Sequence, residues 1–278
     1  MRPAEVLRRA TDYLSRHDVD SPLPTAEVLL AQILGIDRAE LYTRDEGLST
    51  ADAKRFGRAL CRRCVGVPLQ HLTGEQTFRR ITLLVRPGVF IPRPETEILV
   101  DHALASIEAV SAPVVIDVGT GTGAIGLAIK SERPDARVVA IDVCGEAVAL
   151  ARTNAGRLAL DIDVLEGDLL DPVVPSFDGA VDLVVSNPPY VSANELETLP
   201  LDVRADPATA LAGGIDLYER LFAQAARVLR ARGAVAVEIG ETQGEVVRTA
   251  ASTAGLVDVR LEQDLAGRDR VVHARKPA

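Results

Sequence analysis

Short apolar runs alternate with helical patterns through the last two thirds of the chain, and this alternation limits the possible folds more than any other feature. The runs that we expect to be strands are 113–118, 137–142, 161–165, 180–186, 233–239, 257–262 and 270–275. Continuous apolar strands separated by helices are typical of a parallel sheet covered on both faces. Only a few residues separate the last two runs, which predicts an antiparallel hairpin at that end of the sheet. We therefore expect residues 95–278 to form an α/β domain with a doubly wound, mostly parallel, seven-stranded sheet.

The first 66 residues have a different character, because no strand-like run interrupts them. Ala26, Leu29, Leu30 and Ile33 recur at helical spacing, and a serine at position 49 with an aspartate three residues later is typical of a helix start. We expect a small helical bundle over residues 1–66. Residues 67–94 contain a strand-like stretch followed by three clustered prolines, and we interpret this region as a hairpin-containing connector between two domains.

The charge and the cysteine content argue against several classes of protein. The 278 residues carry a formal net charge of −9, whereas a dedicated nucleic-acid binder normally presents a basic face. Three cysteines are too few for a disulfide framework, and no second Cys/His pair completes a metal site with Cys61 and Cys64. Charges recur every few residues near the N-terminus, so we expect neither a signal peptide nor a membrane span. These features predict a cytoplasmic protein without a metal site.

A glycine-rich stretch, "DVGTGTGAIG" at 117–126, follows the first expected strand. Gly121, Gly123 and Gly126 fit the pattern G-x-G-x-x-G, and Asp142 ends the next strand about 20 residues later. Such a turn allows the backbone to approach a ligand closely, and the second acid suits two ribose hydroxyls. The pattern alone leaves nicotinamide and other adenosine cofactors open.

Asp117 favours one of these ligands, because it places a carboxylate beside the loop. A pyrophosphate there would be repelled, whereas an ammonium and a sulfonium would be attracted. S-adenosylmethionine (SAM) carries both groups. We therefore expect SAM to bind at the loop, with Asp117 and Asp142 as the two acids of its site.

The stretch "VVSNPPY" at 184–190 ends an apolar run in an asparagine and two prolines. The fourth strand of such a sheet ends beside the ligand crevice. The Asn187 side-chain oxygen and the Pro188 carbonyl can together accept both hydrogens of a substrate –NH₂, and neither Pro188 nor Pro189 has a competing N–H. Tyr190 offers a flat face for a planar group. This arrangement predicts catalysis by alignment and polarisation, with Asn187, Pro188 and Tyr190 as the catalytic residues.

Several segments together resemble one known family. "PLQHLTGEQTF", "GVFIPRPETE", "DVGTGTGAIGLA", "VVSNPPYV" and "DLAGRDRVV" are similar to blocks of the release-factor glutamine methyltransferases, in the family's order and over nearly the whole chain. "IPRPETE" is the most specific, since glycine loops and NPPY are shared widely among amino methyltransferases. The resemblance implies a Rossmann-like class I methyltransferase fold behind the helical domain.

The resemblance also implies an activity and assigns residues to it. The reaction is N5-methylation, by SAM, of the glutamine in the Gly-Gly-Gln motif of class 1 peptide chain release factors. The residues expected to bind SAM are Asp117, Gly119, Thr120, Gly121, Thr122, Gly123, Asp142, Asp168, Leu169 and Asn187, with Asp168 and Leu169 lining the adenine pocket. The residues expected to bind the glutamine are Asn187, Pro188, Pro189, Tyr190 and Phe90. The chain departs from the family at Asp206, where a glutamate is usual.

Three other interpretations remain open at this point. An amino methyltransferase acting on DNA or RNA bases also uses an N/D-P-P-Y motif, although the acidic catalytic half argues against it. A dinucleotide oxidoreductase fits the glycine loop but not Asp117 or NPPY. A non-catalytic adaptor would not need intact motifs. We expect a monomer whose partners are class 1 release factors, with no direct contact to nucleic acid or membrane, and whose N-terminal helices recognise the protein substrate.

Overall fold

The computed structural model describes residues 1–191, 195–200 and 203–278 and divides into two compact units. The first, helical unit is Met1–Glu75 with Pro200–Ala205, and the second, sheet unit is Gln76–Leu199 with Asp206–Ala278. The division near residue 75 falls inside the stretch 67–94 that the sequence suggests as a connector. Each unit has its own hydrophobic core.

The helical unit contains α1 (Pro3–Ser15), α2 (Pro22–Leu34), α3 (Glu40–Thr43), α4 (Thr50–Cys64) and α5 (Leu69–Thr73). Its core contains Leu7, Leu14, Leu29, Leu30 and Phe56, all of them nearly inaccessible to solvent. Ser49 caps α4 by accepting a hydrogen bond from the backbone N–H of Asp52 at 3.1 Å, as the serine–aspartate spacing predicts. Short α5 packs its leucines onto the same core, so the helical unit extends beyond residue 66.

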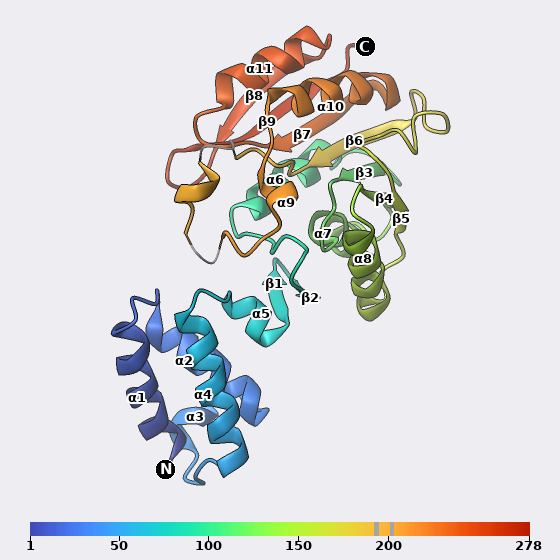
Figure 1. Cartoon of the computed structure of the whole chain (residues 1–278). Coiled ribbons are helices and arrows are strands. Elements are labelled where there is room, and N and C mark those ends of the chain that lie inside the picture. The colour runs from blue at the N-terminus through green and yellow to red at the C-terminus, as the bar shows by residue number, and fades with distance from the viewer. Residues whose placement is uncertain (192–194, 201–202) are drawn as a thin grey trace. The chain divides into compact units, whose positions relative to one another are not determined.

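The sheet unit contains a seven-stranded sheet in the order β5-β4-β3-β6-β7-β9-β8, which confirms the predicted fold class (Figure 1). The strands are β3 (Val114–Val118), β4 (Arg137–Asp142), β5 (Asp163–Glu166), β6 (Val181–Ser186), β7 (Leu229–Glu238), β8 (Val257–Gln263) and β9 (Asp269–Arg275). Strands β3 to β7 pair in parallel, whereas β9 pairs antiparallel with both β7 and β8. The predicted terminal hairpin is therefore present.

Helices cover both faces of this sheet. On one face α6 (Thr96–Ser106), α7 (Ala124–Glu132) and α8 (Gly145–Leu158) pack against β3, β4 and the inner strands; on the other lie α10 (Ile215–Val228) and α11 (Gly244–Thr253). The strands β1 (Glu75–Phe78) and β2 (Ile81–Leu84) form a separate two-stranded sheet. Short α9 (Ala208–Leu211) and a 3₁₀ turn (Leu196–Thr198) lie between β6 and α10.

Strand β7 begins earlier than the apolar pattern predicts. It starts at Leu229 and not at residue 233, directly after α10, and its pairing with β6 shifts between Val181 and Leu183. Arg230 and Arg232 interrupt the apolar run in this extension, which is why the sequence pattern does not reveal it. The irregularity lies at the amino end of the strand and leaves the opposite end unchanged.

The carboxyl ends of the five parallel strands lie along one edge of the sheet, where ligands bind in doubly wound folds. In spatial order, this edge carries Asp168 after β5, Asp142 on β4, the glycine loop after β3, Asn187 after β6 and Glu238 on β7. The fold thus brings four predicted groups, far apart in sequence, to consecutive strand ends. Among the residues that the structure describes, no helix combines the length and the apolar character that crossing a membrane would require.

Candidate active site

The glycine loop follows β3, at the middle of this edge. Gly119, Gly121 and Gly123 have positive φ angles of 69°, 56° and 87°, a conformation that residues with a side chain rarely adopt. A Cβ added at Gly119 would meet nothing within 4 Å, and one at Gly121 would reach only Val89 at 4.0 Å. The space beside these two glycines is therefore open, as a ligand that approaches the backbone requires.

Asp117 lies beneath the loop and not at an open mouth. Its side chain is fully buried, and its Oδ2 accepts hydrogen bonds from the Thr120 hydroxyl at 2.6 Å and from the Gly126 N–H at 2.9 Å. Burial raises the pKa of Asp117 to about 6. Its Oδ1 has no hydrogen-bond partner among the described residues. Asp117 thus fixes the loop, which the sequence did not reveal.

The two threonines of the loop point into the protein. Thr120 and Thr122 are 6% and 2% exposed, and the Thr120 hydroxyl is bound to Asp117. Only their backbone atoms can therefore contact a ligand. The carbonyl of Thr122 is itself bound, since it accepts a hydrogen bond from the Asn154 side chain at 2.9 Å.

Asp142, at the end of β4, also holds the loop. Its Oδ2 accepts a hydrogen bond from the Gly121 N–H at 2.8 Å, and its Oδ1 accepts one from the Cys144 N–H at 2.9 Å. Burial raises its pKa. Each carboxylate oxygen can accept two hydrogen bonds, so both oxygens retain a lone pair for ligand hydroxyls.

Asp168 and Leu169 follow β5 at the next strand end. Asp168 is about half exposed and pairs with Arg220 on α10, a partner that sequence reasoning missed. Leu169 is 8% exposed and has a positive φ of 49°. Its side chain belongs to the core on the α10 face of the sheet. Asp168 therefore offers a polar group at this strand end, whereas the Leu169 side chain is mostly buried in the core.

Asn187 and the residue before it are held by side-chain hydrogen bonds at the end of β6. Its Nδ2 donates a hydrogen bond to the Thr96 hydroxyl on α6 at 3.1 Å. The preceding Ser186 hydroxyl donates to the Val118 carbonyl at 2.7 Å and so joins the end of β6 to the start of the glycine loop. Because Nδ2 faces Thr96, the Asn187 Oδ1 is turned away from it and can serve as an acceptor.

The residues after Asn187 are fixed by close backbone contacts. The Gln243 side chain donates to the Tyr190 carbonyl at 3.0 Å. A Cβ added at Gly213 would lie 1.8 Å from the Pro189 carbonyl oxygen, so only glycine fits there. Burial raises the pKa of Tyr190 to about 12, which keeps its hydroxyl neutral. These contacts fix the position of the NPPY segment.

Phe90 belongs to a second small cluster in the sheet unit. The Arg93 guanidinium carbon lies 5.4 Å from the centre of the Phe90 ring. Arg93 pairs at 2.5 Å with Asp206, which also accepts a hydrogen bond from the Ile91 N–H at 3.2 Å. Asp206 therefore makes supporting contacts to this segment although its side chain is one carbon shorter than the usual glutamate.

Comparison with known proteins gives a consistent result over both units. A family described as PrmC N-terminal domain matches residues 5–74, and one described as methyltransferase small domain matches residues 80–201. Proteins named release factor glutamine methyltransferase are 41% identical in Mycolicibacterium smegmatis, 39% in Deinococcus radiodurans and 40% in Moorella thermoacetica. These similarities cover 98%, 99% and 96% of this chain and 97%, 99% and 95% of those proteins. This chain belongs to the release factor glutamine methyltransferase family.

A solved structure supports the same fold class at a greater distance. The hMettl16 catalytic domain in complex with MAT2A 3'UTR hairpin 6 superposes with a TM-score of 0.57 at 14% identity, over 81% of this chain and 82% of that one. At this identity the likeness concerns the fold alone. It confirms the methyltransferase-type sheet that the sequence predicts for this family member.

Sequence reasoning missed three groups beside the NPPY segment of this methyltransferase. Thr96 begins α6 and binds Asn187. Glu238 ends β7 and is 2% exposed. Arg270 on β9 pairs with Asp264 at 3.2 Å and contributes a positive charge near Tyr190 and Glu238. Thr96 and Arg270 lie within segments that resemble the family, but no local pattern assigns these two residues or Glu238 to the site; only the fold brings the three together.

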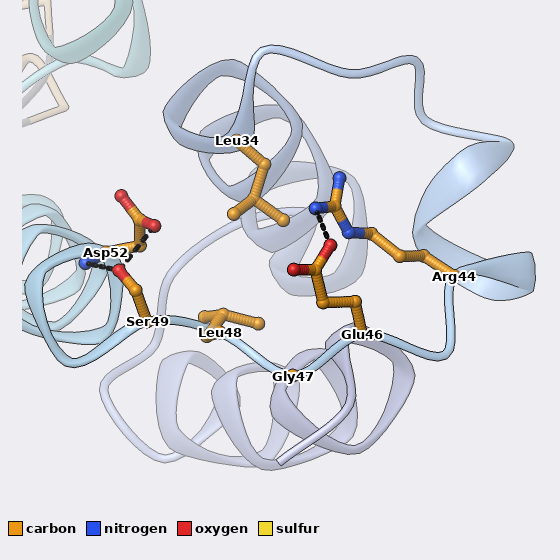
Figure 2. Close-up of a pocket in the computed structure, with 7 residues that line it drawn as sticks. All are labelled: Leu34, Arg44, Glu46, Gly47, Leu48, Ser49 and Asp52. Atoms are coloured by element: carbon orange, nitrogen blue, oxygen red, sulfur yellow. Dashed lines mark hydrogen bonds and ion pairs between the residues drawn. The ribbon is translucent and has the colours of Figure 1, made fainter.

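A pocket in the helical unit lies outside this constellation (Figure 2). It is lined by Leu34, Arg44, Glu46, Gly47, Leu48, Ser49 and Asp52. Its charges are already paired, since Arg44 binds Glu46 at 2.5 Å and the Ser49 hydroxyl binds Asp52 at 2.6 Å. None of the predicted site residues lies there. Within the described ranges, no cluster of three or more His, Cys, Asp or Glu side chains is arranged to hold a metal ion.

Proposed function

We propose that this chain transfers a methyl group from SAM to the side-chain amide nitrogen, N5, of the glutamine in the Gly-Gly-Gln motif of class 1 peptide chain release factors. One observation carries the proposal. Asn187 donates its Nδ2 hydrogen to Thr96 at the end of β6, next to the glycine loop, which supports a role for its Oδ1 as an acceptor for the substrate. A primary amide matches this acceptor.

The residues present fit SAM. The open space beside Gly119 and Gly121 admits an adenosine ligand to the loop backbone, Asp142 retains lone pairs for its ribose hydroxyls, and the unpartnered Oδ1 of Asp117 suits its cationic end. When bound, SAM supplies an electrophilic methyl group on its sulfonium. Asp168 and Leu169 would line the adenine pocket.

The chain's own residues align the amide. Asn187 Oδ1 and the Pro188 carbonyl accept the two amide hydrogens, which fixes the –NH₂ and turns its nitrogen toward the methyl group. The Tyr190 ring stacks on the planar amide, with Pro189 and Phe90 beside it. Accepting both N–H bonds also stabilises the positive charge that develops on the nitrogen as the C–N bond forms. The methylated nitrogen still carries both of its hydrogens and a positive charge, which makes it strongly acidic, so a water molecule can take one proton and no strong base is required.

The alternative substrate is an amino group on a DNA or RNA base. The distant fold likeness to a catalytic domain in complex with an RNA hairpin does not favour it, because 14% identity concerns the fold alone. The net charge of −9 opposes a polyanionic substrate. We place the enzyme in the cytoplasm as a monomer, with the release factor as its partner and no direct contact to nucleic acid.

The test is incubation of the purified enzyme with SAM and either an intact release factor or a nucleic acid. Mass spectrometry should find one added methyl group on the Gly-Gly-Gln peptide of the factor. A factor whose motif glutamine is replaced by alanine should gain none, and neither should the nucleic acid. Methylation of the nucleic acid alone would favour the alternative.

A further inference from the structure

Glu238 is a buried carboxyl group that the mechanism above leaves without a role. It ends β7, and because Ser186 pairs with Val237, Glu238 lies beside Asn187 at the carboxyl edge of the sheet. Its side chain is 2% exposed, and its Oε2 has no hydrogen-bond partner among the described residues. Burying a carboxyl group with an unpaired oxygen is costly. A glutamate at this position therefore requires a reason other than stability.

The surroundings of Glu238 come from four elements. The Thr96 hydroxyl on α6, the Tyr190 hydroxyl after β6 and Arg270 on β9 all favour the charged form of its carboxyl group. Glu95, next to Thr96, opposes that form. Tyr218 on α10 donates to the Glu238 backbone carbonyl at 3.0 Å. Burial outweighs the favourable contacts and raises the pKa of Glu238 to about 7.

The charge on Glu238 fixes which group donates and which accepts between Glu238, Thr96 and Asn187. A charged carboxylate can only accept hydrogen bonds, whereas a hydroxyl donates one and accepts others. When Glu238 is charged, it attracts the hydrogen of the Thr96 hydroxyl toward itself, so this hydroxyl presents lone pairs to Asn187. Asn187 must then present Nδ2 to Thr96, as the structure has it, and Oδ1 to the substrate.

Protonation of Glu238 leaves the donor and acceptor roles of Thr96 and Asn187 undetermined. The carboxylic acid can then donate to Thr96, whose own hydrogen becomes available to Asn187. The Asn187 amide can turn over and present Nδ2, a donor, to the substrate –NH₂. Two donors facing each other cannot align the amide for methyl transfer.

We propose that charged Glu238 is a positioning residue, which acts through the Thr96 hydroxyl to hold the Asn187 amide with its oxygen toward the substrate. This inference rests on the proposed function, since it assigns Asn187 the role of aligning the glutamine. It makes turnover dependent on the ionisation of a group that touches neither substrate nor SAM.

Turnover of the release factor across pH 6 to 8 tests the inference. In the wild-type enzyme kcat should rise as Glu238 loses its proton. Glu238→Gln should lower kcat by roughly 10- to 100-fold, the effect of misplacing an aligning group, and should remove the rise with pH. Its SAM affinity should be unchanged. Thr96→Val should resemble Glu238→Gln, whereas Thr96→Ser, which keeps the hydroxyl, should retain most of the turnover.

A double variant and a matched control variant distinguish a positioning role of Glu238 from a general effect on the structure. The double variant Thr96→Val/Glu238→Gln should be no slower than either single variant, because both break one chain. Asp182→Asn removes another nearly buried carboxylate, paired with Arg230 at the opposite end of β6, and should leave the pH profile unchanged. The inference would be overturned if the two single variants' losses in kcat multiplied in the double variant. It would also be overturned if Glu238→Gln kept the wild-type pH profile.

A measurement without substrate separates this inference from the proposed function. In ¹⁵N-labelled enzyme, the Asn187 side-chain amide signal should shift with pH in the wild type and should stop shifting in Thr96→Val. If this coupling is present but the release factor is not methylated, the proposed function fails and the positioning chain stands. If the factor is methylated but the Asn187 signal does not respond to pH, the positioning chain is refuted.

Discussion

At the scale of single residues, the site is built around carboxyl groups that the fold buries. Asp117 and Glu238 are almost inaccessible to solvent, and burial raises the pKa of both. Each retains one oxygen without a partner among the described residues. Such groups lower stability when they are charged, so their presence indicates that chemistry and not packing selects them.

The free energy of unfolding should depend on pH through Glu238. Its pKa is raised from 4.5 to about 7, so below pH 4.5 it is neutral in both folded and unfolded states and costs nothing. As pH rises to 7 the unfolded state ionises first, and stability falls by up to about 3 kcal/mol. Glu238→Gln should therefore gain stability relative to the wild type between pH 5 and pH 8. Chemical denaturation at both pH values measures this gain.

Glu245→Gln provides the control for this prediction. Glu245 lies on the exposed face of α11 with its side chain 81% accessible. Its removal should change stability little, and equally at both pH values. A stability difference between Glu238→Gln and the wild type that is the same at pH 5 and pH 8 would be inconsistent with a raised pKa.

Asp142→Ala should weaken the binding of SAM. The carboxylate is proposed to accept two ribose hydroxyls, and it also fixes the Gly121 N–H. Loss of charge-assisted hydrogen bonds costs on the order of 1.5–3 kcal/mol, or roughly 10- to 100-fold in Kd. Calorimetry should show this loss, whereas Asp163→Ala at the exposed start of β5 should bind normally. Unchanged affinity in folded Asp142→Ala would remove this residue from the site.

At the scale of elements, the NPPY segment depends on the loop that precedes α10. The Val191 N–H donates to the Leu211 carbonyl at 2.8 Å, and the Gly213 N–H donates to the Val191 carbonyl at 3.1 Å. These bonds bring Gly213 directly against Pro189. The position of the substrate acceptors is therefore set by a segment more than 20 residues later in the chain.

Gly213→Ala should lower turnover without abolishing SAM binding. Its Cβ would lie 1.8 Å from the Pro189 oxygen, so the segment must move, and a misplacement of about 1 Å costs roughly 100-fold in rate. Gly156→Ala is the matched control, because a Cβ on this α8 glycine meets nothing within 4 Å. Steady-state kinetics on the release factor should separate the two. Equal kcat in both variants would mean that Pro189 is not held as described.

The arrangement of the elements also explains which of the site residues could be predicted from the sequence. The glycine loop and NPPY are contiguous, and each follows an apolar run, so local patterns predict both. Thr96 and Glu238 become neighbours of the NPPY segment only because β6 lies between β3 and β7 and α6 packs over them. Gly213 does so through the backbone bonds between its loop and Val191. That order depends on contacts between distant segments. The sequence predicts Asp117 as a site residue, but its spacing does not predict that it is buried beneath the loop.

At the scale of the whole molecule, we propose that chemistry and recognition lie in different units. All residues that we predict to bind SAM or the amide lie in the sheet unit, and the helical unit contains none of them. Leu69 and Leu72 of α5 pack on the helical core, so that core extends to about residue 75. A glutamine side chain offers few atoms, and selecting one glutamine in one protein needs contacts beyond the pocket.

A chain that begins at Gln76 should therefore separate the two tasks. Its SAM affinity should stay near that of the full chain, and its weak activity on a short Gly-Gly-Gln peptide should change little. Its kcat/KM for the intact release factor should fall by more than about tenfold, because the helical unit is expected to supply recognition contacts. Equal kcat/KM of the short and full chains on the intact factor would exclude a recognition role.

The most direct test of the whole account is the turnover of Asn187 variants on an intact release factor. If aligning the amide is the main catalytic device, Asn187→Ala should lower kcat by about 10²–10³ while the enzyme stays folded and still binds SAM. Asn187→Asp keeps an acceptor and should retain more activity than the alanine variant. Wild-type kcat in both variants, with the methyl group still found on the Gly-Gly-Gln glutamine, would contradict the account.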